Sequence, residues 1–103
     1  MGLDININSN ENEILVALKG DLDIYTSPDF SKNILTKFEE DNKDVVIDAE
    51  ALDYIDSTGL GAFISVYKSV SEAGKDLKIT KVKSNVKKIF VITELDKLFR
   101  IEE

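Results

Sequence analysis

Polar and hydrophobic residues alternate near the N-terminus, as they do in a strand with one buried face. Residues 3–8 follow this pattern and predict a first strand, and residues 13–19 predict a second. The connection at residues 9–12 is short and polar, and its Ser and Asn residues favour a turn. The two strands are therefore expected to form an antiparallel hairpin.

Further along the chain, hydrophobic residues recur at spacings of three and four, which predicts amphipathic helices. The first helix is expected to be capped by Ser27 and to end near residues 41–42. The second should start at residues 56–58 with Gly74 at its C-cap, and the third should be capped by Ser84. The predicted apolar faces are Phe30, Ile34, Leu35 and Phe38 in the first helix, Leu60, Phe63, Ile64, Tyr67 and Val70 in the second, and Val86, Ile89, Phe90 and Thr93 in the third.

Two apolar segments between the helices predict further strands. Residues 45–47 form a continuous run, typical of a strand covered on both faces, and residues 77–79 mark another strand. Residues 95–101 predict a short terminal element folded back on the core. This order predicts an α/β fold, a single domain over residues 1–103 with a mixed sheet of four or five strands and helices packed against it. The aromatic residues expected in the core are Phe30, Phe38, Phe63, Tyr67, Phe90 and Phe99.

The composition narrows the range of functions. The chain has 103 residues and a net charge of -7, so it lacks the excess of Lys and Arg that nucleic acid binding requires. It contains no cysteine or histidine, which excludes disulfides, Cys/His zinc sites and Ser-His or Cys-His nucleophiles. No signal peptide or membrane-spanning run is visible. We therefore expect a cytoplasmic protein without a membrane partner, a metal or a cofactor.

Three residue types that cap helices stand in a row at residues 56–58, and Gly59 and Gly61 follow within the first turns. Each glycine costs about 1 kcal/mol of helix propensity relative to Ala, but glycine also lets another surface approach the backbone closely. Ser57 would lie where free N–H groups and the positive end of the helix dipole favour a phosphate. On these residues alone, two interpretations remain open. The segment is either a phosphorylated docking site, or a set of redundant caps with glycines that make room for neighbouring side chains.

The run Asp56-Ser57-Thr58-Gly59-Leu60-Gly61 resembles the signature of the STAS domain, the fold of bacterial anti-sigma factor antagonists. Residues 20–28 are similar to the family's Gly-Glu-Leu-Asp motif, which a Thr and a helix follow. Residues 86–95 are similar to the family's last helix. The resemblance implies that Ser57 is the phosphorylation site and that Asp23 lies beside it.

The general-stress and sporulation antagonists are the most similar members in pattern, although Asp21 replaces a commoner Glu and Glu94 stands where many relatives have glycine. The resemblance implies that the unphosphorylated protein binds an anti-sigma factor that is also a serine kinase, which frees the sigma factor. It also implies that phosphorylation of Ser57 by that kinase abolishes binding and that a serine phosphatase restores it. The chain would be a substrate and not an enzyme. The implied partner-binding residues are Asp23, Tyr25, Thr26, Asp56, Ser57, Thr58, Gly59, Leu60 and Gly61.

Other functions remain as alternatives. An enzyme would need an acid pair or metal site from Asp21, Asp23, Asp48, Asp53 and Asp56. A receiver domain would use Asp48 as phosphoacceptor, with Lys81 or Lys83 as its basic partner. We expect these aspartates to be solvated or capping charges, except that Asp23 could orient the Ser57 hydroxyl. The alternative within the family is a STAS module of a larger sensory or transport assembly without a sigma factor partner.

The remaining aromatic and basic residues near the motifs have simpler expected roles. Tyr25 and Tyr54 flank the two motif segments and are expected to be half-buried or to contact a partner at its rim. Lys87 and Lys88 are expected to form a solvated face. Nucleotide binding by the domain itself has little support, because no Gly-Lys-Ser/Thr follows the glycines as in a P-loop.

Overall fold

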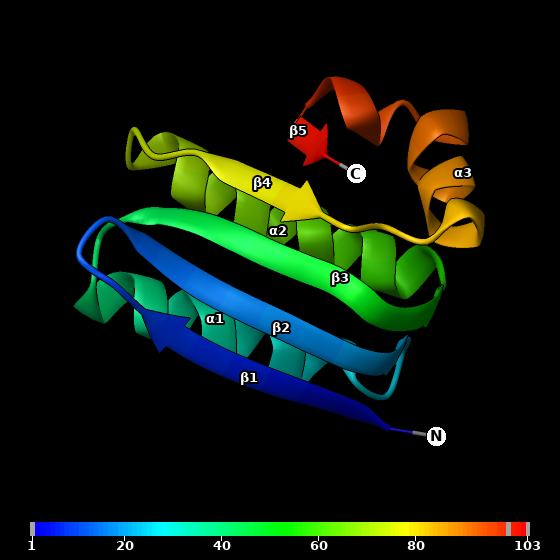
Figure 1. Ribbon diagram of the computed structural model, residues 1–103, viewed down its shortest axis with the longest axis horizontal. Helices are drawn as coiled ribbons and strands as arrows, with labels where there is room; N and C mark the ends of the chain where they lie inside the picture. The colour runs from blue at the N-terminus through cyan, green and yellow to red at the C-terminus, as the bar shows by residue number, and fades with distance from the viewer. Residues whose placement is uncertain (1, 99, 103) are drawn as a thin grey trace.

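The computed structural model describes residues 2–98 and 100–102, which form one five-stranded sheet with helices packed on it (Figure 1). The predicted α/β fold with a mixed sheet is therefore confirmed. No described helix is both long and apolar enough to cross a membrane. The elements in chain order are β1 (Leu3–Ser9), β2 (Glu13–Leu22), α1 (Ser27–Glu40), β3 (Asp44–Ile55), α2 (Ser57–Glu72), β4 (Leu77–Thr80), α3 (Ser84–Ile92), the 3-10 helix η1 (Leu95–Lys97) and β5 (Arg100–Glu102).

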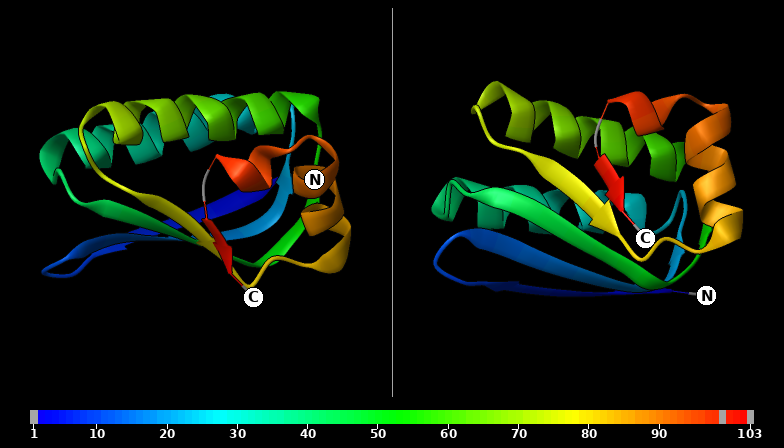
Figure 2. Two further views of the ribbon diagram at one scale, coloured as in Figure 1. Left: turned by 90° about the horizontal axis from the view of Figure 1, so that it is seen from above. Right: turned by 45° about the horizontal axis from the view of Figure 1, so that its top comes forward.

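The strands lie in the sheet in the same order as in the chain. β1 and β2 form the predicted antiparallel hairpin, and β2, β3, β4 and β5 run parallel to one another. α1 and α2 lie side by side on one face of the sheet, and α3 lies at the end where β4 stops (Figure 2). Because each crossover adds its strand on the same side of the last one, the connecting helices fall on the same face.

None of the described helices lies on the other face of the sheet (Figure 2). Side chains of β2 alternate between buried and exposed, so that Ile14 and Val16 are buried while Leu15 is 37% exposed. In β3, Val45 and Ile47 are buried and Val46 between them is only half-buried. The prediction that residues 45–47 are covered on both faces is therefore wrong, because an apolar run alone does not reveal on which side the helices lie.

β3 is longer than predicted and contains two irregularities. It uses 12 residues where its neighbour β2 uses 10, and the pairing shifts register between Ala17 and Lys19 and again between Gly20 and Asp21. Its buried residues follow at intervals of two up to Ala49 and at intervals of three afterwards. These β-bulges break the alternation that marks a strand in the sequence. They also bring Ile55, the last residue of β3, level with Leu22, the last of β2.

The core lies between the sheet and the helices. Phe63 of α2 is at its centre, with its ring centroid 5.0 Å from that of Phe30 in α1 and 5.4 Å from that of Phe90 in α3. All three rings are fully buried, Phe38 is 5% exposed, and Tyr67 is partly buried against the core. The predicted core is confirmed for these five residues, and Phe99 lies outside the described residues. This cluster fixes α3 to the helix that begins at Ser57.

Two predicted caps are displaced by one residue. Ser27 is the first residue of α1, and its hydroxyl donates backwards to the Asp23 carbonyl at 2.6 Å. The N-cap is Thr26. Ser84 likewise begins α3 after Lys83 as N-cap, without a side-chain capping bond. Gly74, in contrast, follows the end of α2 with φ of +77°, the left-handed conformation expected of glycine there.

The C-terminal segment folds back on the core as predicted, with Leu95 buried and Ile101 half-buried. Leu98 is 48% exposed, however, and Thr93 is exposed and donates its hydroxyl to the Ile89 carbonyl at 2.7 Å instead of joining the apolar face. Glu94 has φ of +62°. Glycine adopts this left-handed conformation without strain, which explains why it suits this position in many members of the family that the sequence resembles.

We expect the substitution Glu94→Gly to stabilise the protein by about 1 kcal/mol, because it relieves a left-handed backbone at a residue with a Cβ atom. Urea unfolding would measure the change. Asp96→Gly is the matched control, because Asp96 lies in η1 and a glycine there should destabilise the fold. Equal effects of both substitutions would contradict the explanation.

Candidate functional site

The two motif segments, residues 20–28 and 56–61, lie side by side where the parallel strands β2 and β3 end. Leu22 and Ile55 are paired neighbours in the parallel strands β2 and β3, so the residues after them leave the sheet together. The Asp56 N–H donates to the Leu22 carbonyl at 3.2 Å, so a hydrogen bond joins the two segments at the point where the strands end. Ser57 therefore follows a core strand directly, as the sequence predicted, at the strand ends where α/β sheets place their ligand sites.

Only one of the three capping residues at the start of α2 caps the helix. Asp56 is the N-cap in an extended conformation, and its carboxylate accepts from the Gly59 N–H at 2.9 Å. Ser57 and Thr58 are exposed residues of the first turn. Their own N–H groups precede the first intrahelical hydrogen bonds and point toward the end of the helix. The hydroxyl of Ser57 is thus accessible and is not needed to cap α2.

The two glycines of the motif have different roles. Gly59 is buried, and a Cβ atom built on it would lie 2.6 Å from the Leu22 carbonyl oxygen and 2.8 Å from Cγ1 of Ile55. The surface that approaches Gly59 closely thus belongs to β2 and β3 of the same chain. This corrects the prediction that Gly59 belongs to an exposed docking surface. Gly61 is exposed, and a Cβ atom there would meet nothing within 4 Å.

Asp23 organises the turn that connects β2 to α1. Its Oδ1 accepts from the N–H groups of Tyr25 at 2.9 Å and Thr26 at 3.1 Å. The Thr26 hydroxyl oxygen accepts in return from the Asp23 N–H at 2.9 Å. None of the hydrogen bonds among the described residues joins the Asp23 carboxylate to Ser57. The orienting role of Asp23 stays a prediction, and the geometry gives this residue a definite structural role.

Large apolar side chains are exposed around the motif loops. Tyr25 is 86% exposed and its neighbour Ile24 is 60% exposed, at the tip of the turn that Asp23 holds. Tyr54, next to the end of β3, is 50% exposed. Leu60 is half-buried. No local pattern predicted the exposure of Ile24, because its exposure depends on the turn and no alternation marks it. Together, these side chains supply apolar area that a partner can bury.

Two of the other candidate aspartates pair with lysines. Asp53 pairs with Lys83 and accepts from the Asn85 side chain through its carbonyl at 3.0 Å, which joins α3 to the end of β3. Asp48 lies within β3, where Lys81 is 3.7 Å from its carboxylate. Asp48 therefore does not lie at the end of a strand, where a receiver domain would need its phosphoacceptor. Among the described residues, no three carboxylates gather in a way that could hold a metal ion.

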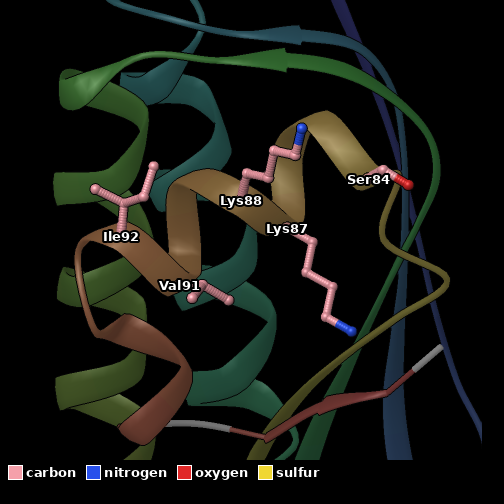
Figure 3. A pocket seen from close by; sticks show the side chains of 5 residues that line it. All are labelled: Ser84, Lys87, Lys88, Val91 and Ile92. Carbon is pink, nitrogen blue, oxygen red and sulfur yellow. The ribbon is translucent and has the colours of Figure 1, made fainter.

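A shallow hollow on α3 forms a second accessible surface at the end of the sheet where β4 stops. Lys87 and Lys88, expected in a solvated face, line it together with Val91 and Ile92 (Figure 3). Ile92 is 79% exposed and Val91 is 49% exposed. The helical period predicted Val86 and Phe90 for the buried face of α3 and did not indicate that hydrophobic residues also lie on its outer face.

We expect Gly59→Ala to destabilise the protein by about 2 kcal/mol or more, because the methyl group would push α2 away from Leu22. Gly61→Ala is the matched control within the same helix, and it should stabilise by up to about 1 kcal/mol. Urea unfolding of the two variants measures both effects. A Gly59→Ala protein as stable as the wild type would contradict the tight contact between α2 and β2.

Comparison with known proteins agrees with this architecture. Residues 4–103 match the family model of the STAS domain. The chain is 30% identical over its full length to the anti-sigma-B factor antagonist of Staphylococcus aureus, covering 95% of that protein. It is 32% identical to the anti-sigma-B factor antagonist of Bacillus subtilis, over 98% of this chain and 92% of the relative.

A solved structure gives the same fold. The crystal structure of an anti-sigma factor antagonist from Mycobacterium paratuberculosis superposes with a TM-score of 0.87 at 19% identity, covering 97% of this chain and 85% of that one. The family match extends over both motif loops and the last helix, the segments that carried the resemblance in the sequence. The chain belongs to the STAS domain family.

Proposed function

We propose that this protein is an anti-sigma factor antagonist whose binding is switched by phosphorylation of Ser57. In its unphosphorylated form it binds an anti-sigma factor that is also a serine kinase, and the sigma factor is released. The kinase then phosphorylates Ser57 and the complex dissociates, and a serine phosphatase resets the switch. The names of the two bacterial relatives support the antagonist role.

The exposed hydroxyl of Ser57 at the first position of α2 is the observation that carries this proposal. A kinase can reach a side chain there without unfolding the domain. Because Asp56 caps the helix, modification of Ser57 leaves the cap in place. The exposed Ile24 and Tyr25 on the neighbouring turn supply the apolar contacts for a docked partner.

The charge of a phosphate explains how the switch works. In the transfer, the Ser57 hydroxyl oxygen attacks the γ-phosphorus of ATP, its proton passes to the kinase, and ADP leaves. ATP and magnesium belong to the kinase site. The product carries about -2 at neutral pH and lies beside the free N–H groups of the first turn, which tolerate it. A partner that covers it must remove its water, and an unpaired buried charge costs several kcal/mol.

In this proposal the chain is a substrate and a binding module, and it catalyses nothing. Asp23 and Asp56, the two carboxylates expected at the site, have structural roles. Asp23 accepts the N–H groups of its turn, and Asp56 accepts from Gly59.

We expect Ser57→Ala to bind the kinase as tightly as the wild type but to remain bound when ATP is added. Ser57→Asp should bind on the order of a hundredfold more weakly, because a charge must be buried in the interface. Titration calorimetry with the purified kinase, with and without ATP, measures both effects, and mass spectrometry locates the phosphate.

Ser65→Asp is the matched control, because Ser65 is also exposed on α2 and lies more than two turns further along. It should leave binding unchanged. If Ser57→Asp bound as tightly as Ser65→Asp, or if the kinase placed its phosphate on another residue, the proposed switch would be wrong.

A further inference from the structure

The two edges of the sheet differ in how well they are protected. β5, at one edge, has three residues, including the charged Arg100 and Glu102. β1, at the other edge, has seven residues that pair with β2 without a register shift. Its sequence contains no Lys or Pro and only one charged residue, Asp4. Lysine, proline, bulges and short length are the usual protections against edge-to-edge pairing, and β1 has none of them.

The hydrogen bonds at both ends of the hairpin show which backbone groups of β1 face the free edge. Asp21 donates its N–H to the Gly2 carbonyl at 3.1 Å, and Asn10 donates to the Glu13 carbonyl at 2.9 Å. Hydrogen-bonded pairs alternate along an antiparallel ladder. The even-numbered residues of β1 therefore bond to β2, and the N–H and C=O groups of Leu3, Ile5, Ile7 and Ser9 point away from β2.

We propose that β1 pairs with β1 of a second copy of this chain, antiparallel and symmetric about Asn6. In this register, Ile5 faces Ile7 of the other copy, and the free backbone groups of both strands meet as hydrogen-bonded pairs. On the open face of the sheet, Asp4 lies opposite Asn8 and Asn6 lies opposite itself. The only charged residue of β1 thus avoids its own symmetry mate, and like charges are not placed opposite each other.

The helix above β1 fits the same symmetry. Ile5 and Ile7 are half-buried and line a hollow at this edge together with residues of α1 that include Lys32, Thr36 and Glu40. Thr36 lies midway between the other two along the helix. A two-fold axis at Asn6 therefore brings Lys32 of one copy to the level of Glu40 of the other, twice in each dimer. Both side chains are exposed, and pairing also buries isoleucine area that the monomer leaves in water.

The inference does not depend on the proposed switch. β1 lies at the lateral edge of the sheet, whereas Ser57 follows the carboxyl end of β3 (Figure 1). Pairing would join two five-stranded sheets into one with the helices of both copies on the same face. Because the two copies run in opposite directions, their Ser57 residues would lie at opposite ends of the joint sheet, accessible to two separate kinase molecules.

Site-directed cysteine pairing tests the register, because the chain has no cysteine of its own. In Asn6→Cys, the two cysteines form a non-hydrogen-bonded pair with Cα atoms about 4.5 Å apart, within disulfide range. We expect mild oxidation to give a covalent dimer. In Asn8→Cys, the two cysteines would be about 13 Å apart and should not react. Ala17→Cys lies opposite Asn6 on β2 and serves as an interior control on the same face.

Charge reversal tests the helix contacts without cysteine. By analytical ultracentrifugation, Lys32→Glu or Glu40→Lys alone should weaken the wild-type dimer roughly fivefold or more, and the double variant should restore it. Lys68→Glu, an exposed residue of α2, carries the same change in net charge and should behave like the wild type. A wild-type chain that stays monomeric at millimolar concentration would overturn the inference, as would equal oxidation of Asn6→Cys and Asn8→Cys.

Discussion

The contact between Gly59 and the Leu22 carbonyl is the constraint on which the site depends. It lets the first turn of α2 lie directly on the last residue of β2, a position that any side chain would block. The Asp56 N–H bonds to the same carbonyl, and the Asp56 carboxylate bonds to Gly59. A single backbone oxygen of β2 thus defines where the helix begins. The accessible serine is held by this packing and does not have to contribute to it.

This arrangement separates the stability of the fold from the chemistry of the switch. Phe63 packs against Phe30 of α1 and Phe90 of α3 in the core, and Asp56 caps α2. Ser57 lies outside both sets of contacts. A phosphate can therefore appear and disappear at the end of the helix without a large effect on folding, because the helix dipole and free N–H groups favour the charge. Its effect falls on whatever docks against the exposed turn that Asp23 holds.

The sequence predicted what depends on local rules. Alternation predicted the β1–β2 hairpin, and the position of Asp56 located the start of α2. What it could not predict depends on contacts between distant residues. The bulges hid the second half of β3, and apolar content could not show that Val46 is only half-buried on the face of the sheet opposite the helices. Gly59 is buried because the end of β2 packs against the start of α2, and Ile24 is exposed because it lies at the tip of the turn that follows β2. No local pattern in the sequence encodes either fact.

The two bulges of β3 have a consequence for sequence change in this segment. Successive side chains of a regular strand face opposite sides, so an inserted residue would invert the facing of everything that follows it. A bulge absorbs the inserted residue, and for this reason Leu52 and Ile55 still face the core although each lies three residues after the buried residue before it. The extra residues thus lengthen β3 without turning its exit over, and the first turn of α2 keeps its side of the sheet. Loss of a single bulge residue would therefore restore regular alternation and leave Ile55 facing the core.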